Sequence, residues 1–386
     1  MTIDARLKEF IERGGAWTSA YVDGSGSLPQ VEEEAREKSV RDRLIADGAP
    51  TEDAVAIERA LAQRNGLPSP SARIVFATGG EIALDESFAD GRRGPERLSH
   101  GPLPEILPAL RHASGTVRYL VVETSRDAAD IRLEKAARGA LTHTSVEGDS
   151  DDMTKVQAGG WSHANFQRSA ENTWKRNQTD VAAAVSELIR EEHPAFVAVA
   201  GDVRARQLLV DALGSAEREL VVDIDVHAQA DGADLTDVDE AIAQAVEHHV
   251  RDRIERIRDR AAEDSGSGGA EGIDEVTAAL QQARVDTLLL DGRMLDDGTP
   301  DGGAGLLALD APPWIASDAS ESLGAGTICR LPVPEALARA AVLTDAGVMV
   351  EEEEPRADDA ARDERPVRQP LASLRWADPD EGDEAQ

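Results

Sequence analysis

The sequence predicts an α/β fold, and three features of the chain support that class. Short strands rich in Val, Leu and Ile alternate with helices between residues 117 and 224. The same alternation returns between residues 273 and 350. Between these stretches, residues 237–262 place an apolar side chain at every third or fourth position, the period of a long amphipathic helix. Because alternating strands and helices build layers of helices on a sheet, we expect two α/β modules with a long linking helix between them.

Residues 1–112 predict an α+β domain ahead of these modules. Gly79-Gly80 lies between two short apolar runs within residues 73–84, which indicates a hairpin. The other expected elements of this domain are helices at 4–13, 30–47 and 51–65 and an extended run at 16–22.

The remaining elements follow in chain order. The central domain, 113–230, is expected to contain strands at 117–123, 196–200 and 220–224 and helices at 165–190 and 202–213. The C-terminal α/β domain, 236–350, is expected to contain helices at 237–262, 273–283 and 334–344, a flexible linker at 265–269, and strands at 285–290, 326–331 and 347–350. The last segment, 351–386, holds 13 acids against five Arg and includes four Pro, so we expect a disordered acidic tail.

The charge of the chain is strongly negative. Its 386 residues include 75 Asp and Glu against 41 Lys and Arg, a formal net charge of -34, and only five of the basic residues are Lys. Carboxylates spread over most of a chain with almost no Lys are typical of proteins adapted to molar salt, in which self-repulsion is screened. We therefore expect a halophilic protein.

Cysteine content and hydropathy indicate the cellular compartment of the protein. The single Cys329 excludes an internal disulfide framework and a thiolate-rich metal cluster within one chain, and its apolar surroundings favour a core position. No run of apolar residues is long enough to span a bilayer, and residues 1–15 contain no apolar leader. We expect a cytoplasmic protein with no membrane partner and no cofactor.

Residues 155–176 differ from the rest of the chain. Lys155, Arg168, Lys175 and Arg176 face a single acid, which gives a net charge of +3, and two of the five Trp fall in this segment. Gly159-Gly160 followed by Trp161 could bring backbone amides and a stacking surface to a phosphate-bearing ligand. The alternative is an ordinary helix entry, with Ser162 as N-cap and Trp174 in the core.

This segment resembles a known family. Gly159-Gly160-Trp161-Ser162, followed by Phe166 and Arg168, is similar to the loop and helix of the central domain of archaeal and eukaryotic class-1 release factors, whose motif begins Gly-Gly-Gln-Ser. The segments 272–276 and 285–290 resemble the C-terminal domain of that family and of Pelota. The resemblance covers roughly residues 113–350 and is strongest to the divergent bacterial and archaeal branch that includes the hibernation factor Balon. It implies a three-domain body that enters the ribosomal A site.

Two departures from the family pattern bear on activity. Trp161 stands where release factors have the Gln that places water for attack on peptidyl-tRNA, and an indole has one donor and no acceptor. Residues 1–112 also contain no Asn-Ile-Lys-Ser codon-reading motif. We therefore name no catalytic residue. The resemblance further implies that 236–350 docks a translational GTPase of the elongation factor type.

Other motifs in the chain indicate no further chemistry. No GxxxxGK[ST] phosphate loop and no GxSxG nucleophile motif occurs. His248 and His249 are adjacent on a helix and point apart, so we expect no metal site there.

Three functions remain open at the level of sequence. We favour a non-enzymatic factor that occupies the A site in hibernation or rescue, with Gly159, Gly160, Trp161 and Ser162 facing the peptidyl transferase centre. In this hypothesis Lys155, Arg168, Lys175 and Arg176 contact rRNA phosphates. The second hypothesis is a peptidyl-tRNA hydrolase in which Gln157 or loop amides position water. The third is an acidic adaptor that does not bind RNA.

Overall fold

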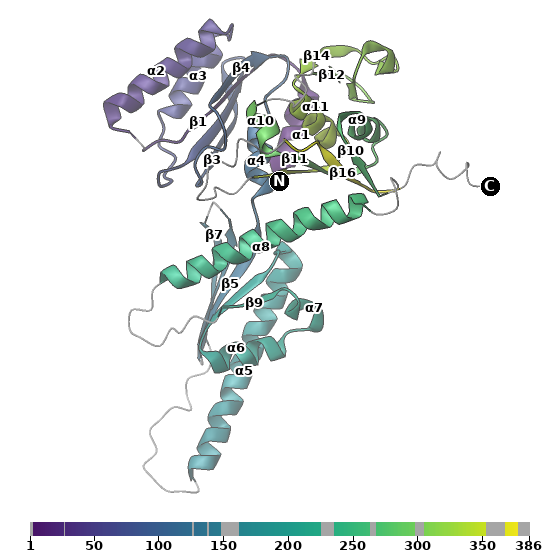
Figure 1. Ribbon diagram of the computed structural model, residues 1–386. Helices are drawn as coiled ribbons and strands as arrows, with labels where there is room; N and C mark the ends of the chain where they lie inside the picture. The colour runs from purple at the N-terminus through teal and green to yellow at the C-terminus, as the bar shows by residue number, and fades with distance from the viewer. Residues whose placement is uncertain are drawn as a thin grey trace, which may run out of the picture. The chain divides into compact units, whose positions relative to one another are not determined.

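The computed structural model describes nine stretches of the chain and groups them into two compact units. Unit 1 comprises residues 1–115 and 252–386, and unit 2 comprises residues 116–251 (Figure 1). The described residues are 3–26, 28–125, 127–136, 139–147, 162–224, 235–262, 268–297, 305–352 and 367–376.

The N-terminal part of unit 1 is an antiparallel sheet in the order β3-β2-β1-β4. Alternate residues of β1 serve two cores, as the two-residue period of a strand requires. Ala20 and Val22 pack against α2 and α3, whereas Trp17 and Tyr21 join the opposite core. The hairpin expected at 73–84 is confirmed. The elements of this part are α1 (Ile3–Arg13), β1 (Trp17–Asp23), α2 (Gln30–Ala46), α3 (Thr51–Leu61), β2 (Ala72–Thr78), β3 (Glu81–Phe88), β4 (Arg97–Gly101) and α4 (Leu107–Ser114).

The C-terminal part of unit 1 has a sheet in the order β10-β16-β11-β15 and a small antiparallel sheet in the order β13-β12-β14. The helices expected at 273–283 and 334–344 and the strands expected at 285–290, 326–331 and 347–350 are present, whereas α10, β12, β13 and η2 were not expected. The elements are β10 (Gly269–Glu271), α9 (Ile273–Gln281), β11 (Val285–Asp291), α10 (Gly292–Asp297), β12 (Leu306–Leu309), β13 (Ile315–Ala316), η2 (Ala319–Ser322), β14 (Thr327–Leu331), α11 (Val333–Leu343), β15 (Gly347–Glu351) and β16 (Leu371–Leu374).

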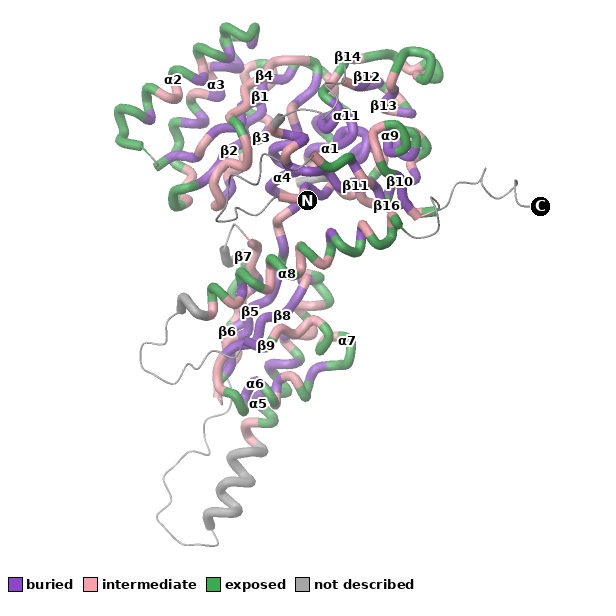
Figure 2. The backbone as a smooth tube through the Cα atoms, in the orientation of Figure 1, coloured by how far each residue is buried: buried purple, intermediate pink, exposed green. Residues whose placement is uncertain are grey.

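The two parts of unit 1 share one core, which differs from the expected separate domains at 1–112 and 236–350. Leu7 of α1 and Leu110 of α4 lie in the same buried cluster as Leu280 and Leu337. Helix α11 is buried along its whole length, as Figure 2 shows, and contacts α1, α4 and α9. Nine of the eleven residues of α11 are apolar, so the helix has to be covered on most of its surface, and the N-terminal helices supply part of that cover.

The segment 351–386 is not wholly a tail. Within the described residues 367–376, β16 lies between β10 and β11 and pairs with both. Ala372 and Leu374 are buried. The expectation of a disordered tail is therefore wrong for these residues, because a short apolar run inside an acidic segment completes the sheet. Likewise Gly269, expected in a linker, belongs to β10, where a Cβ would lie 2.3 Å from the Cα of Ala261.

Unit 2 is a five-stranded sheet with helices on both faces. The strand order is β7-β6-β5-β8-β9. Strands β5, β8 and β9 run parallel to one another, and β6 pairs antiparallel with both of its neighbours, β5 and β7. One face packs against α5 and α6 and the other against the first half of α8 (Figure 1). The elements are β5 (Arg118–Thr124), β6 (Ala128–Lys135), β7 (Gly139–Glu147), α5 (Ser162–Glu192), β8 (Val197–Gly201), α6 (Val203–Ala212), α7 (Ser215–Arg218), β9 (Val221–Asp223) and α8 (Leu235–Ala262).

The predicted α/β class is confirmed, as are the strands and helices expected in the central domain. Asp202 caps α6 as its position suggests, with its Oδ1 accepting from the amides of Arg204 and Ala205 at 2.9 and 3.1 Å. Strands β6 and β7 were not expected. Over the part of the chain that the structure describes, no helix combines the length and apolar character needed to cross a membrane.

Candidate functional site

The residues singled out in the sequence lie around the start of α5. Lys155, Gly159, Gly160 and Trp161 lie outside the described residues, in the segment that connects β7 to α5. Ser162 is the first residue of α5, and Arg168 lies further along the same helix. The segment that contains the first four of these residues therefore follows the edge strand β7 in the chain and precedes α5.

Lys175 and Arg176 are exposed on α5, directly before the buried residues Asn177 and Gln178. Val181, Ala182 and Val185 pack on the sheet. Trp174, which one interpretation placed in the core, is only partly buried.

Two buried polar contacts fix this part of α5 to the sheet. Gln178 is 1% exposed; its Nε2 donates to the Ser125 carbonyl at 2.8 Å, and its Oε1 accepts from Thr124 Oγ1 at 2.9 Å. Ser125 follows β5 directly, so the amide ties α5 to the carboxyl end of a central strand. Ligand sites of open α/β sheets are built at this edge. Sequence inspection missed Gln178, because a polar residue on a charged helix face gives no signal of burial.

The carboxyl ends of β5 and β8 also lie close together. Gly201 at the end of β8 has φ +113°, and a Cβ on it would lie 2.1 Å from the Thr124 carbonyl oxygen. Only glycine fits this backbone without strain. This close contact between β5 and β8 lies at Thr124, whose Oγ1 donates to Gln178.

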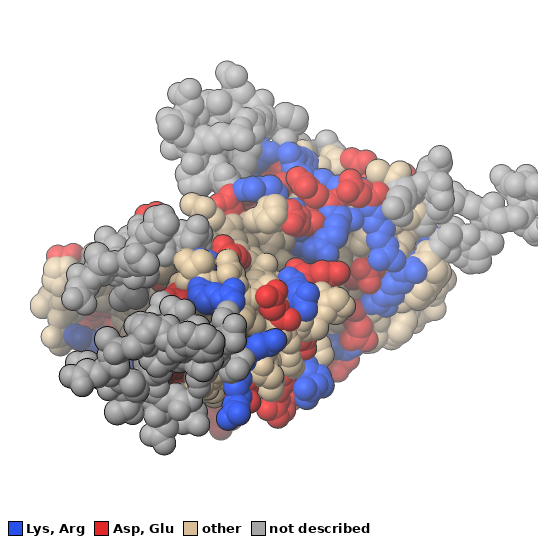
Figure 3. All heavy atoms as spheres, turned by 90° about the horizontal axis from the view of Figure 1, so that it is seen from below, with Lys and Arg blue, Asp and Glu red and all other residues tan. Residues whose placement is uncertain are grey.

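The charges near this site are unevenly paired. Arg132 of β6 forms ion pairs with Glu123, Asp130 and Glu134 at 2.6, 3.3 and 3.0 Å. Lys175 and Arg176, by contrast, form no ion pair with any residue that the structure describes. On the face seen in Figure 3, Lys and Arg side chains are interspersed with Asp and Glu. An exposed cation without an acidic partner in so acidic a chain is free to bind an external anion.

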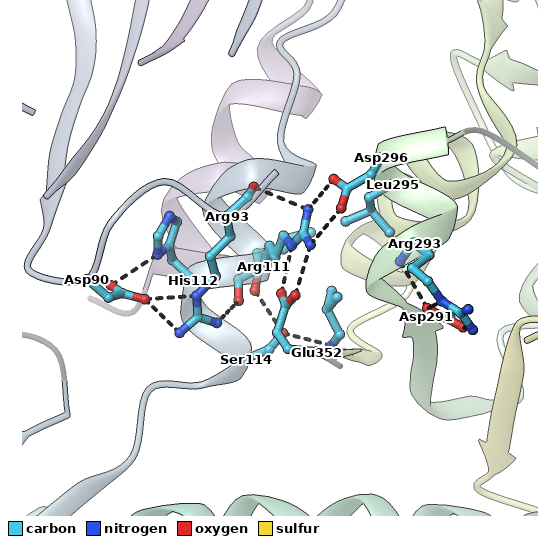
Figure 4. A network of polar contacts seen from close by, with 12 residues as sticks. Asp90, Arg93, Arg111, His112, Ser114, Asp291, Arg293, Leu295, Asp296 and Glu352 are labelled. Carbon is cyan, nitrogen blue, oxygen red and sulfur yellow. Dashed lines mark hydrogen bonds and ion pairs between the residues drawn. The ribbon is translucent and has the colours of Figure 1, made fainter. Parts of the chain in front are cut away.

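A second polar cluster lies in unit 1 and has a structural role (Figure 4). The Arg111 guanidinium of α4 donates to Asp296 Oδ1 at 2.7 Å and to Glu352 Oε1 at 2.6 Å. Burial alone lowers the pKa of Arg111, but its hydrogen bonds to Glu352 and Asp296 outweigh burial and raise it. The guanidinium thus joins the N-terminal helix α4 to the C-terminal part of the same unit.

His112 belongs to the same cluster and forms a tyrosine, histidine and aspartate chain. Its Nε2 lies 2.8 Å from the Tyr21 hydroxyl and its Nδ1 lies 3.2 Å from Asp90 Oδ1, while Phe88 stacks on the ring at 4.0 Å. Burial lowers the pKa of His112 and raises the pKa of Tyr21 to about 12. This row of three hydrogen-bonded side chains resembles a catalytic relay. Tyr21 and His112 are each 2% exposed, however, so a substrate has no access to it.

Glu335 of α11 is a third buried titratable group. Its carboxyl oxygens accept from the amides of Ile106 and Leu107 at 2.7 and 3.3 Å, which caps the start of α4. Burial, with Glu105 nearby, raises the pKa of Glu335 to about 8. No group of three or more His, Cys, Asp or Glu suited to a metal ion occurs among the described residues.

Comparison with known proteins gives one family match. Residues 118–267 match the sequence model of bacterial archaeo-eukaryotic release factor family 2. Two Mycobacterium tuberculosis proteins, both named as uncharacterized, are 25% identical over 296 residues, which is 74% of this chain and 77% of theirs. They are MT2704 of strain CDC 1551 / Oshkosh and Rv2629 of strain ATCC 25618 / H37Rv.

Solved structures also align with the chain, at low similarity. The archaeal termination factor aRF1 is 16% identical with a TM-score of 0.24, and the alignment covers 97% of each chain. Saccharomyces cerevisiae Dom34 is 11% identical with a TM-score of 0.39, over 80% of this chain and 81% of its own. Archaeoglobus fulgidus Pelota is 14% identical with a TM-score of 0.31, over 97% of this chain and 91% of its own.

The matched segment contains the whole of the unit 2 sheet, α5 and its preceding loop. The family resemblance expected from Gly159, Gly160 and Arg168 is therefore confirmed for this region. Residues 118–267, which are less than half of the chain, are therefore similar to bacterial archaeo-eukaryotic release factor family 2.

Proposed function

We propose that the protein is a ribosome-associated translation factor that occupies the A site, in hibernation or rescue, without hydrolysing peptidyl-tRNA. One observation carries this proposal. The region that matches the release factor family contains Gly159-Gly160-Trp161-Ser162, in which an indole replaces the water-placing amide. The family framework supports a ribosomal partner, and the replaced residue argues against hydrolysis.

Trp161 has the chemistry of a contact residue in this proposal. Its ring offers a large face on which a base can stack, and its single N–H cannot both accept from and donate to an attacking water. In the proposed complex Gly159 and Gly160 let the backbone approach rRNA closely, Ser162 starts the supporting helix, and Trp161 blocks the peptidyl transferase centre.

The cations of α5 supply phosphate contacts in the same complex. Lys175 and Arg176 are exposed, and neither pairs with a carboxylate of the described residues. Gln178, one turn further on, holds the helix to the sheet, so both cations project from a fixed support. We include Lys155 and Arg168 in this set on sequence grounds, and we propose 236–350 as the segment that docks a translational GTPase of the elongation factor type.

Co-sedimentation with ribosomes in high salt, using stationary-phase cells, tests the proposal. We expect the wild-type protein in the ribosomal pellet. A variant that combines Trp161→Ala, Lys175→Glu and Arg176→Glu should move to the supernatant. An Arg41→Glu and Arg43→Glu variant, which changes two paired cations of α2, is the matched control and should still pellet. Wild-type protein found in the supernatant, or a triple variant that still pellets, would overturn the proposal.

A peptide-release assay tests the absence of hydrolysis separately. Ribosomes that carry peptidyl-tRNA in the P site are incubated with the protein, and released peptide is counted. We expect release at the level of buffer alone. Release that requires Gln157 or Trp161 would instead assign the protein as a peptidyl-tRNA hydrolase, while leaving its ribosome binding intact.

A further inference from the structure

The second half of α8 departs from the acidic composition of the chain. Residues 251–260 contain five Arg against three acids, in a protein whose net charge is -34. From residue 252 onward this helix belongs to unit 1. It therefore lies in a different unit from the cations of α5.

Three of these arginines form a stripe along one side of the helix. Arg253, Arg256 and Arg260 are spaced three and four residues apart, which places them within about 60° of one another around the axis and over roughly 10 Å along it. All three are exposed. Ile254 and Ile257, on another side of the helix, are 7% and 6% exposed. We refer to the three residues as the arginine stripe.

The arginine stripe lacks acidic partners. None of its three side chains forms an ion pair with a residue that the structure describes; Arg256 Nε donates instead to the Asp252 carbonyl oxygen at 3.2 Å. The acids of this stretch, at positions 252, 255 and 259, occupy the neighbouring side of the helix. Like charges at these spacings destabilise a helix, so the sequence retains a small unfavourable interaction here.

Neighbouring arginines behave differently. Arg258 pairs with Glu351, and Arg368 pairs with the same carboxylate at 2.7 Å. Arg251, on the far side of α8, pairs with Glu247. Glu351 is thus shared by two guanidinium groups that lie outside the stripe. The arginine stripe is an exposed cationic surface without an ion pair to any described residue.

We propose that the arginine stripe binds the phosphate backbone of an RNA strand. Guanidinium groups form bidentate hydrogen bonds with phosphate oxygens, and a row of them along a helix can contact successive phosphates. The choice of RNA, rather than an acidic protein, rests on the proposed function. In that setting the arginine stripe gives unit 1 its own contact with rRNA, independent of the loop and cations of unit 2.

Fluorescence anisotropy with a labelled 20-nucleotide oligo-U tests this proposal. The full-length protein is titrated at KCl concentrations between about 0.1 and 1 M, a range over which exposed charges become strongly screened. The test variant is Arg253→Gln, Arg256→Gln, Arg260→Gln. The control variant is Arg36→Gln, Arg41→Gln, Arg43→Gln, which removes the same charge from α2, where each arginine has a carboxylate partner. Thermal unfolding verifies that every variant is folded.

We expect the test variant to bind RNA about tenfold or more weakly at the lowest salt, and its slope of log affinity against log salt to fall by about 2, since each phosphate contact on a single strand contributes roughly 0.7. The control should bind as the wild type does. Equal affinity of wild type and test variant overturns the proposal. So does competition by polyglutamate at equal charge concentration, which would identify an acidic protein as the partner.

The outcome is separable from that of the proposed function. If the Lys175→Glu, Arg176→Glu variant loses ribosome binding while the test variant keeps its RNA affinity, the arginine stripe proposal fails and the proposed function stands. If wild-type protein binds neither ribosomes nor the oligonucleotide, both fail.

Discussion

Arg111 of unit 1 and the cations Lys175 and Arg176 of unit 2 have opposite environments. In unit 1 the Arg111 side chain is 5% exposed and lies between the carboxylates of Asp296 and Glu352. In unit 2 Lys175 and Arg176 are exposed and have no ion pair with a described residue. Arg111 and Arg176 have the same guanidinium group, and the partners of that group decide its role. A buried and paired cation holds segments together, and an exposed and unpaired one is available to a ligand.

The largest loss of stability should come from removing the buried cation Arg111 from its two carboxylate partners. Arg111→Met leaves two carboxylates partly buried without their cation, and loss of one partner from a buried pair costs about 3–5 kcal/mol. Denaturant unfolding followed by tryptophan fluorescence measures the change. Arg41→Met, which removes the exposed cation of an ion pair on α2, should cost far less, because solvent screens such pairs. Equal losses for the two variants would contradict a structural role for Arg111.

The buried carboxyl group of Glu335 should make the free energy of unfolding depend on pH. Its folded pKa, raised by burial, exceeds the ordinary value of 4.5, so the folded state holds a proton that the unfolded state releases. The stabilisation is complete below the unfolded pKa and declines by up to about 1.4 kcal/mol per pH unit as the pH rises towards 8. The free energy of unfolding, measured between pH 5 and 8, should show this decline in the wild type. Glu335→Gln should flatten it, and an unchanged slope in that variant would assign the decline to other groups.

A smaller effect is expected at the support of α5. Gln178→Ala removes a buried amide and leaves Thr124 Oγ1 and the Ser125 carbonyl without that partner, which should cost about 1–3 kcal/mol. Hydrogen exchange of the amides at 173–180 should become faster. Thr179→Ala, at the adjacent exposed position, is the control and should change exchange little. Unaltered exchange after Gln178→Ala would mean that packing alone fixes the helix.

The smallest effect on stability should come from the unpaired cations themselves. Lys175→Gln with Arg176→Gln should change the free energy of unfolding by less than about 0.5 kcal/mol, as is usual for surface substitutions. Ribosome affinity should nevertheless fall, and the fall should be greatest at low salt. A clear loss of stability would show that these side chains serve the fold, which would remove their contrast with Arg111.

The sequence predicted elements whose pattern is local. The strands at 117–123 and 196–200 are runs of Val, Leu and Ala, and the hairpin at 73–84 carries its own turn residues. Strand β6 was missed because Asp130, Arg132 and Glu134 alternate with its apolar residues and resemble a charged loop. Strand β16 was missed because four residues within an acidic segment give too short a pattern.

Long-range packing could not be predicted from local patterns. The core that joins α1 and α4 to α11 depends on segments more than 200 residues apart. The one available signal was α11 itself, whose sequence Val-Pro-Glu-Ala-Leu-Ala-Arg-Ala-Ala-Val-Leu is apolar apart from Glu335 and Arg339 and therefore requires cover on most of its surface. The loop residues of the candidate site were found from spacing and family resemblance, whereas Gln178 required the structure.

Competition for the A site tests the central claim most directly. Ribosomes with deacylated tRNA in the P site are incubated with labelled protein, and A-site tRNA is then titrated in. A factor that occupies the A site should be displaced in proportion to bound A-site tRNA, and the Trp161→Ala, Lys175→Glu, Arg176→Glu variant should not bind at the start. Protein that stays bound to ribosomes whose A sites are filled with tRNA would contradict the proposed function.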